Sequence, residues 1–386
     1  MSASWPGSET AVAVSDTCEY RALYVHVPFC VSRCGYCDFV TEAVSPDDPC
    51  MDRYVAGLVE DIRTAGQEGL LAKVRTIYLG GGTPTFMGRR RLGELCACIV
   101  NTVPMDGVVE FTVEANPESL SEGMLGDLVD RGVNRLSLGV QSFVDAELEA
   151  LGRAHDARQA RLAVEMAVDA LENVSLDLMC GVPGQDEASW HRSLEASLRS
   201  GVRHVSVYPL LVAEDTPFGR RIAQGSMAEV EDDLMAALME QAAFELEGTG
   251  FSRYEVASYA REGYACRHNV AYWTGEPYVG LGRGAAAMRQ TAQGRERIED
   301  GVVVERLSPT EALWEDLMLG MRMSAGVLAS AVHEAARINA EVLDVFKLLE
   351  EWGLVRLFEG RYRPTPRGWL MGNEIFWRIW ESRPMK

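Results

Sequence analysis

The sequence predicts an α/β fold built on a parallel β-sheet, and three observations lead to this prediction. Short apolar runs alternate six times with segments of helical hydrophobic periodicity. Such alternation implies right-handed strand–helix–strand crossovers, which make the sheet parallel. Unusual residues follow nearly every expected strand at its carboxyl end, where barrel enzymes build their sites. The sheet is expected to be doubly wound or curved into a barrel.

The expected strands are short runs of apolar and β-branched residues. They are Leu23–Val27, Thr76–Leu79, Glu110–Ala115, Arg135–Val140, Val174–Met179 and His204–Pro209. Segments that follow them, such as Asp52–Ala65 and Ala157–Leu171, repeat apolar residues every three or four positions, which predicts amphipathic helices.

A loop with three cysteines, Cys30-x-x-x-Cys34-x-x-Cys37, follows the first expected strand. Each of these thiolates can take a different corner of an iron–sulfur cube, and the sequence has no fourth cysteine nearby to close it. One iron would stay open to a small chelating ligand. The alternative is a zinc knuckle completed by Asp38 or His26, but structural zinc prefers paired Cys-x-x-Cys ligands.

Glycines and acids follow the next strands. The run Gly80–Gly82 comes after the second strand, where glycines let the backbone approach a ligand closely, although a tight turn explains such a run equally well. Glu114 and Asp177 lie near the ends of the third and fifth strands and could accept hydrogen bonds from hydroxyl or ammonium groups. Either acid alone is more often a cap or an ion-pair partner. Their position at one end of the sheet favours a binding site.

Charge and hydropathy limit the possible partners and location. The formal net charge of −20 over 386 residues argues against nucleic-acid binding, which needs clustered Lys and Arg. The chain has neither a run of about 20 apolar residues that could span a bilayer nor the order of a secretory signal. We therefore expect a cytoplasmic protein whose cysteines are thiols or metal ligands. Structural or surface thiols are expected at Cys18, Cys50, Cys96, Cys98 and Cys180.

The carboxyl-terminal part reads as a small α+β domain. A helical pattern over 340–352 stops at Gly353, strands at 354–358 and 361–363 flank a Glu-Gly turn, and another helix begins near Pro366. This order is typical of a winged-helix-like unit. Such units often bind DNA, but the overall acidity favours a cover over the sheet or a partner-docking surface. The first twenty residues are expected to be a flexible extension.

Together these motifs carry a resemblance to a known family. They are Cys30-x-x-x-Cys34-x-x-Cys37-Asp38-Phe39, Gly80–Pro84, Glu114-Ala115-Asn116-Pro117, Gly139-Val140-Gln141-Ser142-Phe143, Leu151-Gly152-Arg153-x-His155 and Asp177-Leu178-Met179-x-Gly181-x-Pro183-Gly184. Over about residues 20–380 the chain resembles the radical-SAM branch that contains oxygen-independent coproporphyrinogen dehydrogenase and the HemW heme chaperones. The resemblance implies a six-stranded partial (β/α) TIM-like barrel at 21–250, a linker at 251–305 and a winged-helix-type HemN-like domain at 306–386.

The cofactors follow from this resemblance. Cys30, Cys34 and Cys37 would hold a [4Fe–4S] cluster whose open iron binds S-adenosylmethionine (SAM). An external electron donor would reduce the cluster, and SAM would be cleaved to methionine and a 5′-deoxyadenosyl radical, while protein groups only orient this chemistry. The implied SAM contacts are Tyr24, Gly81, Gly82, Thr83, Glu114, Gln141, Arg153 and Asp177.

Two features favour the chaperones over the dehydrogenases. The dehydrogenases carry a further cysteine two positions after the third, where this chain has Phe39, and they are longer. The segment Arg267-His268-Asn269-x-x-Tyr272-Trp273 resembles the HNxxYW signature of the chaperones. By this resemblance His268 would ligate heme iron, and Tyr272 and Trp273 would pack on the macrocycle. A core histidine among aromatic rings is the alternative, and Cys266 is an alternative ligand.

One position departs from the family pattern. The family usually continues Gly-x-Gly-Ala-His, whereas here Gly282-Arg283-Gly284-Ala285 is followed by Ala286. Arg283 could pair with a heme propionate or face solvent. The resemblance implies a protein that binds heme and transfers it to an acceptor protein, which could be membrane-associated. The alternatives are oxidative decarboxylation of coproporphyrinogen III and radical-SAM chemistry on another substrate.

Overall fold

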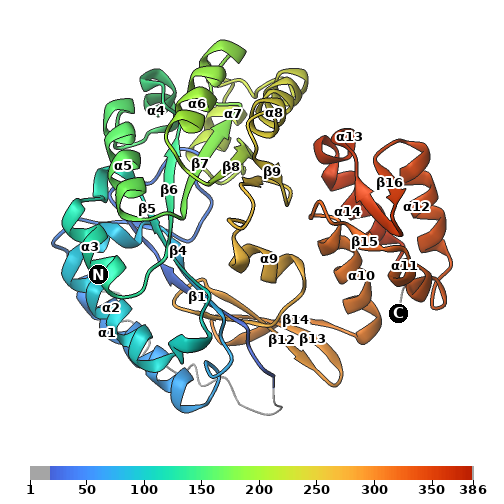
Figure 1. Cartoon of the computed structure of the whole chain (residues 1–386), viewed down its shortest axis with the longest axis horizontal. Helices are drawn as coiled ribbons and strands as arrows, with labels where there is room; N and C mark the ends of the chain where they lie inside the picture. Colours follow the sequence, from blue (N-terminus) through green and yellow to red (C-terminus); the bar gives the residue numbers. More distant parts are fainter. Residues whose placement is uncertain (1–17, 385–386) are drawn as a thin grey trace.

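The computed structural model describes residues 18–384, so nearly all of the expected extension at 1–20 lies outside the described residues. Six parallel strands form the centre of one large sheet (Figure 1), and each lies where the sequence predicts it. In sheet order they are β1 (Ala22–Val27), β4 (Thr76–Gly81), β5 (Glu110–Ala115), β6 (Arg135–Gln141), β7 (Val174–Cys180) and β8 (His204–Pro209). Most of their residues are buried, as expected for a parallel sheet covered on both faces.

The sheet does not stop at six strands, because the segment expected as a linker, 251–305, extends it at both edges. β11 runs parallel to the outer edge of β1, and three antiparallel strands continue from it. Two short strands pair beyond β8. These additions occupy backbone groups that an open edge would leave unpaired. The added strands are β9 (Ser252–Arg253), β10 (Ser258–Ala260), β11 (Tyr278–Leu281), β12 (Ala286–Thr291), β13 (Gly294–Glu299) and β14 (Val302–Leu307).

Helices lie along the outer side of the parallel strands (Figure 1). They are α1 (Cys50–Gln67), α2 (Gly88–Thr102), α3 (Glu122–Asp130), α4 (Asp145–Leu151), α5 (Ala157–Ala170), α6 (Glu187–Arg199) and α8 (Asp232–Glu247). The short helix α7 (Pro217–Ala223) instead contacts the cysteine loop, where the Phe218 amide donates to the Gly35 carbonyl at 2.8 Å. In α1 the buried residues recur every three or four positions and join one core with the strands, which confirms the predicted amphipathic pattern. Shorter elements are β2 (Phe29–Cys30), β3 (Glu42–Ala43) and three 3₁₀ turns at 84–87, 105–107 and 117–119.

The carboxyl-terminal residues form a second unit with its own core, built around Trp314, Phe346 and Ile379. The predicted helix, hairpin and helix are present, and the helix before the hairpin ends at a glycine with positive φ, Gly353. Its first helix, α10, packs against β13 of the large sheet and against α9 (Arg267–Trp273), the helix between β10 and β11. The elements of the unit are α10 (Pro309–Gly320), β15 (Val327–Leu328), α11 (Ala329–Ala336), α12 (Glu341–Glu351), β16 (Val355–Phe358), β17 (Arg361–Pro364), α13 (Pro366–Leu370) and α14 (Gly372–Glu381).

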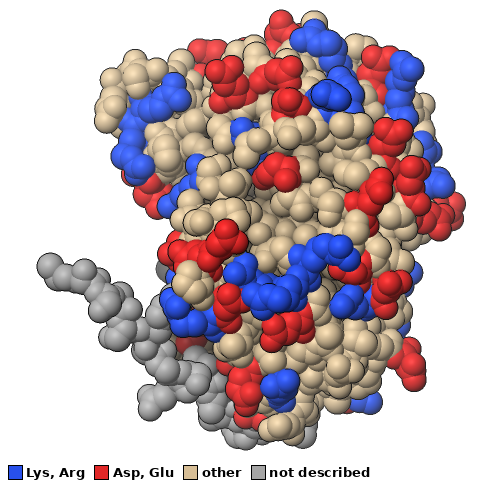
Figure 2. All heavy atoms as spheres, turned by 90° about the vertical axis from the view of Figure 1, so that its left-hand side faces the viewer, with Lys and Arg blue, Asp and Glu red and all other residues tan. Residues whose placement is uncertain are grey.

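Acidic and basic side chains are interspersed on the face shown in Figure 2. On the outer helices Arg89 pairs with Asp127 at 2.7 Å, and Arg91 pairs with Asp52 at 3.0 Å. These arginines form ion pairs with carboxylates. A nucleic-acid-binding surface is instead marked by an unbroken stripe of basic side chains. None of the helices between residues 18 and 384 combines the length and the apolar character that a membrane crossing requires.

Candidate functional site

The three cysteines of the motif lie on one loop at the carboxyl end of β1. Cys30 ends β2, and the amide of Cys37 donates to the carbonyl of Cys34 at 3.3 Å. All three are free thiols and partly exposed. In the part of the chain that the structure describes, no three His, Cys, Asp or Glu side chains have the spacing that a single metal ion requires. The thiols are thus brought to one loop, but not to one mononuclear site.

Each thiol has a polar neighbour that could stabilise a cluster. The Thr83 hydroxyl donates to Cys30 Sγ at 3.7 Å, the Arg153 Nη1 lies 3.5 Å from Cys34 Sγ, and the Thr41 Oγ1 lies 3.9 Å from Cys37 Sγ. Burial raises the pKa of Cys30 to about 11, so this thiol is protonated until a metal displaces the proton. Hydrogen bonds and positive charge near sulfur suit an iron–sulfur cluster, whose properties depend on both.

Local packing requires the glycines at the carboxyl end of β4. A side chain at Gly81, where φ is 110°, would meet the ring of His26 at 2.4 Å, and one at Gly82 would meet the Phe29 carbonyl oxygen at 2.7 Å. The amides are already used, because Gly81 donates to Glu114 Oε2 at 2.9 Å and Gly82 donates to the Val27 carbonyl at 2.7 Å. These glycines therefore offer a ligand close backbone approach rather than free amides.

The two predicted acids lie near the carboxyl ends of β5 and β7, the strands on either side of β6. Glu114 accepts hydrogen bonds from the Tyr78 hydroxyl at 2.7 Å and from the Gly81 amide, and burial raises the pKa of its carboxyl to about 7. Asp177 accepts from the Ser137 hydroxyl at 3.3 Å, and burial likewise raises its pKa. A polar ligand that donates hydrogen bonds would stabilise the charged form of either acid.

The predicted Gln141 and Arg153 carry polar atoms without partners. Gln141 ends β6 with φ of 66°, and its Oε1 is buried without a hydrogen bond. Arg153 Nη2 donates to Asn116 Oδ1 at 2.7 Å and to the Gly139 carbonyl at 2.8 Å, while its buried Nε has no partner. Strained backbone and unsatisfied polar atoms are concentrated at functional sites. These residues therefore fit a polar ligand such as SAM.

His26, which the sequence suggested only as a zinc ligand, lies beside Tyr24, one of the predicted SAM contacts. His26 Nε2 must donate to the Val40 carbonyl at 2.9 Å, so its Nδ1 accepts from the Tyr24 hydroxyl, also at 2.9 Å. This pair connects β1 to the cysteine loop. A signal was present in the sequence, because Tyr24 and His26 are two positions apart in a strand and share one face.

His268, the predicted heme ligand, is only 1% exposed. Its Nδ1 lies 3.0 Å from the Thr76 hydroxyl and its Nε2 lies 2.9 Å from the Tyr272 hydroxyl, so both ring nitrogens have partners inside the protein. Burial lowers its pKa to about 3, which keeps the ring neutral. The geometry is that of a core histidine among aromatic rings. Cys266 is also fully buried, with its sulfur 3.5 Å from a Glu110 oxygen.

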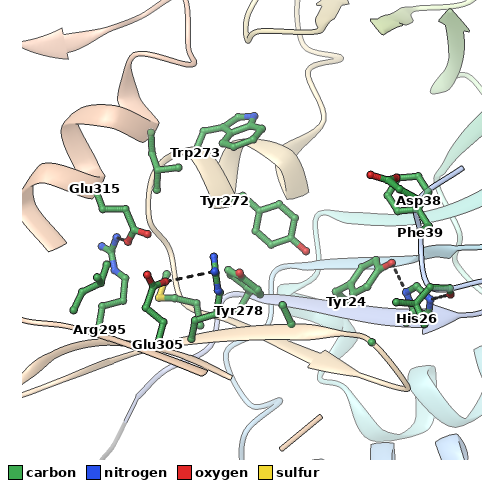
Figure 3. Close-up of a pocket in the computed structure, with 17 residues that line it drawn as sticks. Tyr24, His26, Asp38, Phe39, Tyr272, Trp273, Tyr278, Arg295, Glu305 and Glu315 are labelled. Carbon is green, nitrogen blue, oxygen red and sulfur yellow. Dashed lines mark hydrogen bonds and ion pairs between the residues drawn. The ribbon is translucent and has the colours of Figure 1, made fainter. Parts of the chain in front are cut away.

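A cavity of about 550 Å³ lies between the cysteine loop, α9, β12–β14 and α10 (Figure 3). We call it the aromatic pocket, because its walls include Tyr24, Phe39, Tyr272, Trp273 and Tyr278. It lies next to the predicted SAM site, since Tyr24 belongs to both.

Single residues of the pocket wall bear on the sequence predictions. Ala286, which stands where the family usually has histidine, lines the pocket. Arg283 is not among the lining residues, and its Nη2 pairs with Glu42 at 3.1 Å.

Replacing Glu114 with glutamine should raise the free energy of unfolding relative to the wild type at neutral and higher pH. The folded-state pKa of about 7 lies above the ordinary 4.5, so the wild-type carboxyl costs stability as pH rises between these values, by up to about 3 kcal/mol. The variant should therefore gain on the wild type between about pH 5 and about pH 8 in urea unfolding. Glu60→Gln on the exposed side of α1 should show no such change, and a parallel pH dependence of both variants would contradict the assignment.

Known proteins match both parts of the chain. Residues 24–196 match the radical SAM superfamily, and residues 307–371 match the HemN C-terminal domain. The heme chaperone HemW of Bacillus subtilis is 33% identical over 375 residues, which cover 92% of this chain and 98% of that protein. The heme chaperone HemW of Escherichia coli is 35% identical over 265 residues, or 68% of this chain and 69% of that protein.

A solved structure shares the fold. Coproporphyrinogen III oxidase (HemN) from Escherichia coli, a radical SAM enzyme, superimposes with a TM-score of 0.78 at 19% identity, over 94% of this chain and 90% of that one. The 33% identity over 98% of the Bacillus subtilis protein, together with both domain matches, establishes the relationship. This chain belongs to the HemW family of radical-SAM proteins.

Proposed function

We propose that this protein is a heme chaperone that binds heme in the aromatic pocket and transfers it to an acceptor protein. The observation that carries the proposal is the pocket itself, with its volume of about 550 Å³ and five aromatic side chains. Flat aromatic walls suit a porphyrin, and the volume is within the range of cofactor sites. The family relationship supports the same function, since the related proteins are named heme chaperones.

The pocket also contains a cation that could receive a propionate. The side chain of Arg297 is 49% exposed, and its nitrogens lie 3.8 Å from Glu299 and 3.6 Å from Glu305. Both distances exceed those of a hydrogen bond, so the guanidinium is held loosely by its own chain. A carboxylate of the ligand could make the closer, bidentate contact that arginine prefers.

The cofactors would lie beside this pocket. Cys30, Cys34 and Cys37 would hold the [4Fe–4S] cluster, which, when bound and reduced by an electron donor, supplies the electron for SAM chemistry. Gly81, Gly82, Thr83, Glu114, Gln141, Arg153, Asp177 and Tyr24 would hold SAM. Because Asp38 and Phe39 of the cysteine loop line the pocket, cluster loading would stabilise one of the pocket walls.

The carboxyl-terminal domain at 306–386 would cover the pocket and take part in docking the acceptor. Glu315 and Leu319 of α10 line the pocket, so a movement of this winged-helix-like domain relative to the barrel at 21–250 would open one side of it. The acceptor could be membrane-associated, and we propose that the exchange takes place in the cytoplasm.

The second candidate is oxidative decarboxylation of coproporphyrinogen III, favoured by the fold shared with HemN. Phe39 opposes it, because the dehydrogenases have cysteine at this position. Phe39 is 63% exposed and lines the pocket, so it offers a ring rather than a thiol to the ligand.

Transfer of heme separates a chaperone from a storage protein. Protein loaded with one equivalent of hemin should pass it to excess apomyoglobin, followed by the Soret band after the two proteins are separated. Loading of the cluster and SAM should change the transfer rate, because Tyr24 and the cysteine loop belong to both sites. Hemin that stays bound in every cofactor state would contradict the proposed function.

A further inference from the structure

The atoms that can reach heme iron are restricted by the pocket wall. Neither His268 nor Cys266 lines the aromatic pocket. The lining residues with a donor atom suited to iron are the phenols of Tyr24, Tyr272 and Tyr278, the His26 imidazole and the Met288 thioether. His26 uses both ring nitrogens in hydrogen bonds to Tyr24 and Val40. The phenols are therefore the main candidates, and phenolate oxygen is an established ligand of heme iron.

Tyr272 is the phenol placed best for this task. Figure 3 shows its hydroxyl end directed from α9 into the pocket, toward Tyr24. The Tyr272 ring packs edge-to-face on Tyr278, with centroids 4.5 Å apart, which fixes its orientation. In contrast, the hydroxyl of Tyr24 turns toward His26 at the cysteine-loop end of the pocket (Figure 3) and donates to its Nδ1.

The imidazole behind Tyr272 completes the arrangement. His268 Nε2 lies 2.9 Å from the Tyr272 hydroxyl, and its Nδ1 lies 3.0 Å from the Thr76 hydroxyl. With the proton on Nδ1, the ring donates to Thr76 and accepts from Tyr272. The phenol then directs its hydrogen inward and leaves its oxygen lone pairs to the pocket. A histidine in this second position orients the ligand, as second-layer partners do at metal sites.

We propose that Tyr272, and not His268, coordinates the iron of ferric heme, and that His268 is the positioning residue behind it. This inference rests on the proposed heme-binding function. Coordination forms an Fe–O bond and breaks the phenol O–H bond, while iron stays Fe(III). The phenol proton passes to His268 Nε2, which then donates to the phenolate, and the proton on Nδ1 is lost to bulk water so that the Thr76 hydroxyl donates to Nδ1. The phenolate neutralises the positive charge of the ferric porphyrin core, which favours coordination inside a poorly solvated pocket.

Ferric heme titrations followed by absorption and electron paramagnetic resonance test the assignment. The wild type should show a phenolate-to-iron charge-transfer band with high-spin ferric iron. Tyr272→Phe keeps the ring packing but should lose this band and raise the dissociation constant by about tenfold or more. His268→Gln should keep the band at a shifted energy. The matched control is Tyr264→Phe, whose hydroxyl pairs with Glu172 outside the pocket, and it should behave as the wild type.

The outcomes distinguish this inference from the function on which it rests. A Tyr272→Phe spectrum identical to that of the wild type would overturn the assignment while leaving heme binding intact. Low-spin imidazole ligation that only His268→Gln removes would overturn it in favour of the histidine. A wild type that binds no heme would remove the proposed function itself. Thermal unfolding of each variant identifies a general loss of folding.

Discussion

Replacing Cys30, Cys34 and Cys37 together with alanine will abolish the iron–sulfur absorbance of the anaerobically reconstituted protein. The three sulfurs lie on one partly exposed loop, each beside one of the polar groups of Thr83, Arg153 and Thr41. The other six cysteines between residues 18 and 384 offer no second group of three thiols on one loop. The fold should survive, because none of the three cysteines belongs to the hydrophobic core. Iron and sulfide content measures the loss.

A matched double variant controls for the loss of thiols as such. Cys18→Ala with Cys50→Ala removes two other partly exposed cysteines and should keep the full iron and sulfide content. Undiminished iron and sulfide in the triple variant would show that the cluster is held elsewhere.

Replacing Arg153 with methionine will weaken both the fold and SAM binding. Its guanidinium joins three elements of the site, through Asn116, the Gly139 carbonyl and the Cys34 sulfur. Methionine keeps most of the apolar stem but leaves two acceptors without their donor, which should cost about 2 to 4 kcal/mol of unfolding free energy. The loss of the charge beside Cys34 should lower the affinity of the cluster-loaded protein for SAM by about a hundredfold.

Urea unfolding and calorimetric SAM titration measure the two effects of Arg153→Met separately. Arg158→Met on the exposed side of α5 is the matched control, and it should change stability by less than about 0.5 kcal/mol. SAM affinity equal to the wild type in the Arg153 variant would remove this residue from the site.

The central strands could be predicted because a strand that is buried on both faces appears in the sequence as a short run of apolar residues. The runs at 110–115 and 204–209 coincide with β5 and β8, and the cysteine loop lies at the strand end where the sequence placed it. Most of the strands that the segment 251–305 adds are short or rich in charged residues, so their signal is weaker, although β14 begins with three valines. β13 reads Gly-Arg-Glu-Arg-Ile-Glu with one apolar residue, and β11 pairs with β1 more than 250 positions earlier in the chain. Pairing at such distances depends on the folded sheet rather than on local pattern.

The sequence identified which residues belong to the site better than it indicated how their side chains are oriented. The motif located His268, but its hydrogen bond to Thr76 crosses 192 positions and could not be foreseen. The same holds for Gln141, whose positive φ depends on how β6 ends against its neighbours. Orientation is decisive here, because it turns the predicted ligand His268 into a partner of Tyr272.

The most direct test of the account is an anaerobic heme titration of the cluster-loaded protein, followed in the same sample by an assay for coproporphyrinogen III decarboxylation with SAM and a reductant. The account predicts saturable binding of one heme per chain and no decarboxylation. Turnover of coproporphyrinogen without tight heme binding would contradict it, and would mean that Phe39 does not separate this protein from the enzymes of heme synthesis.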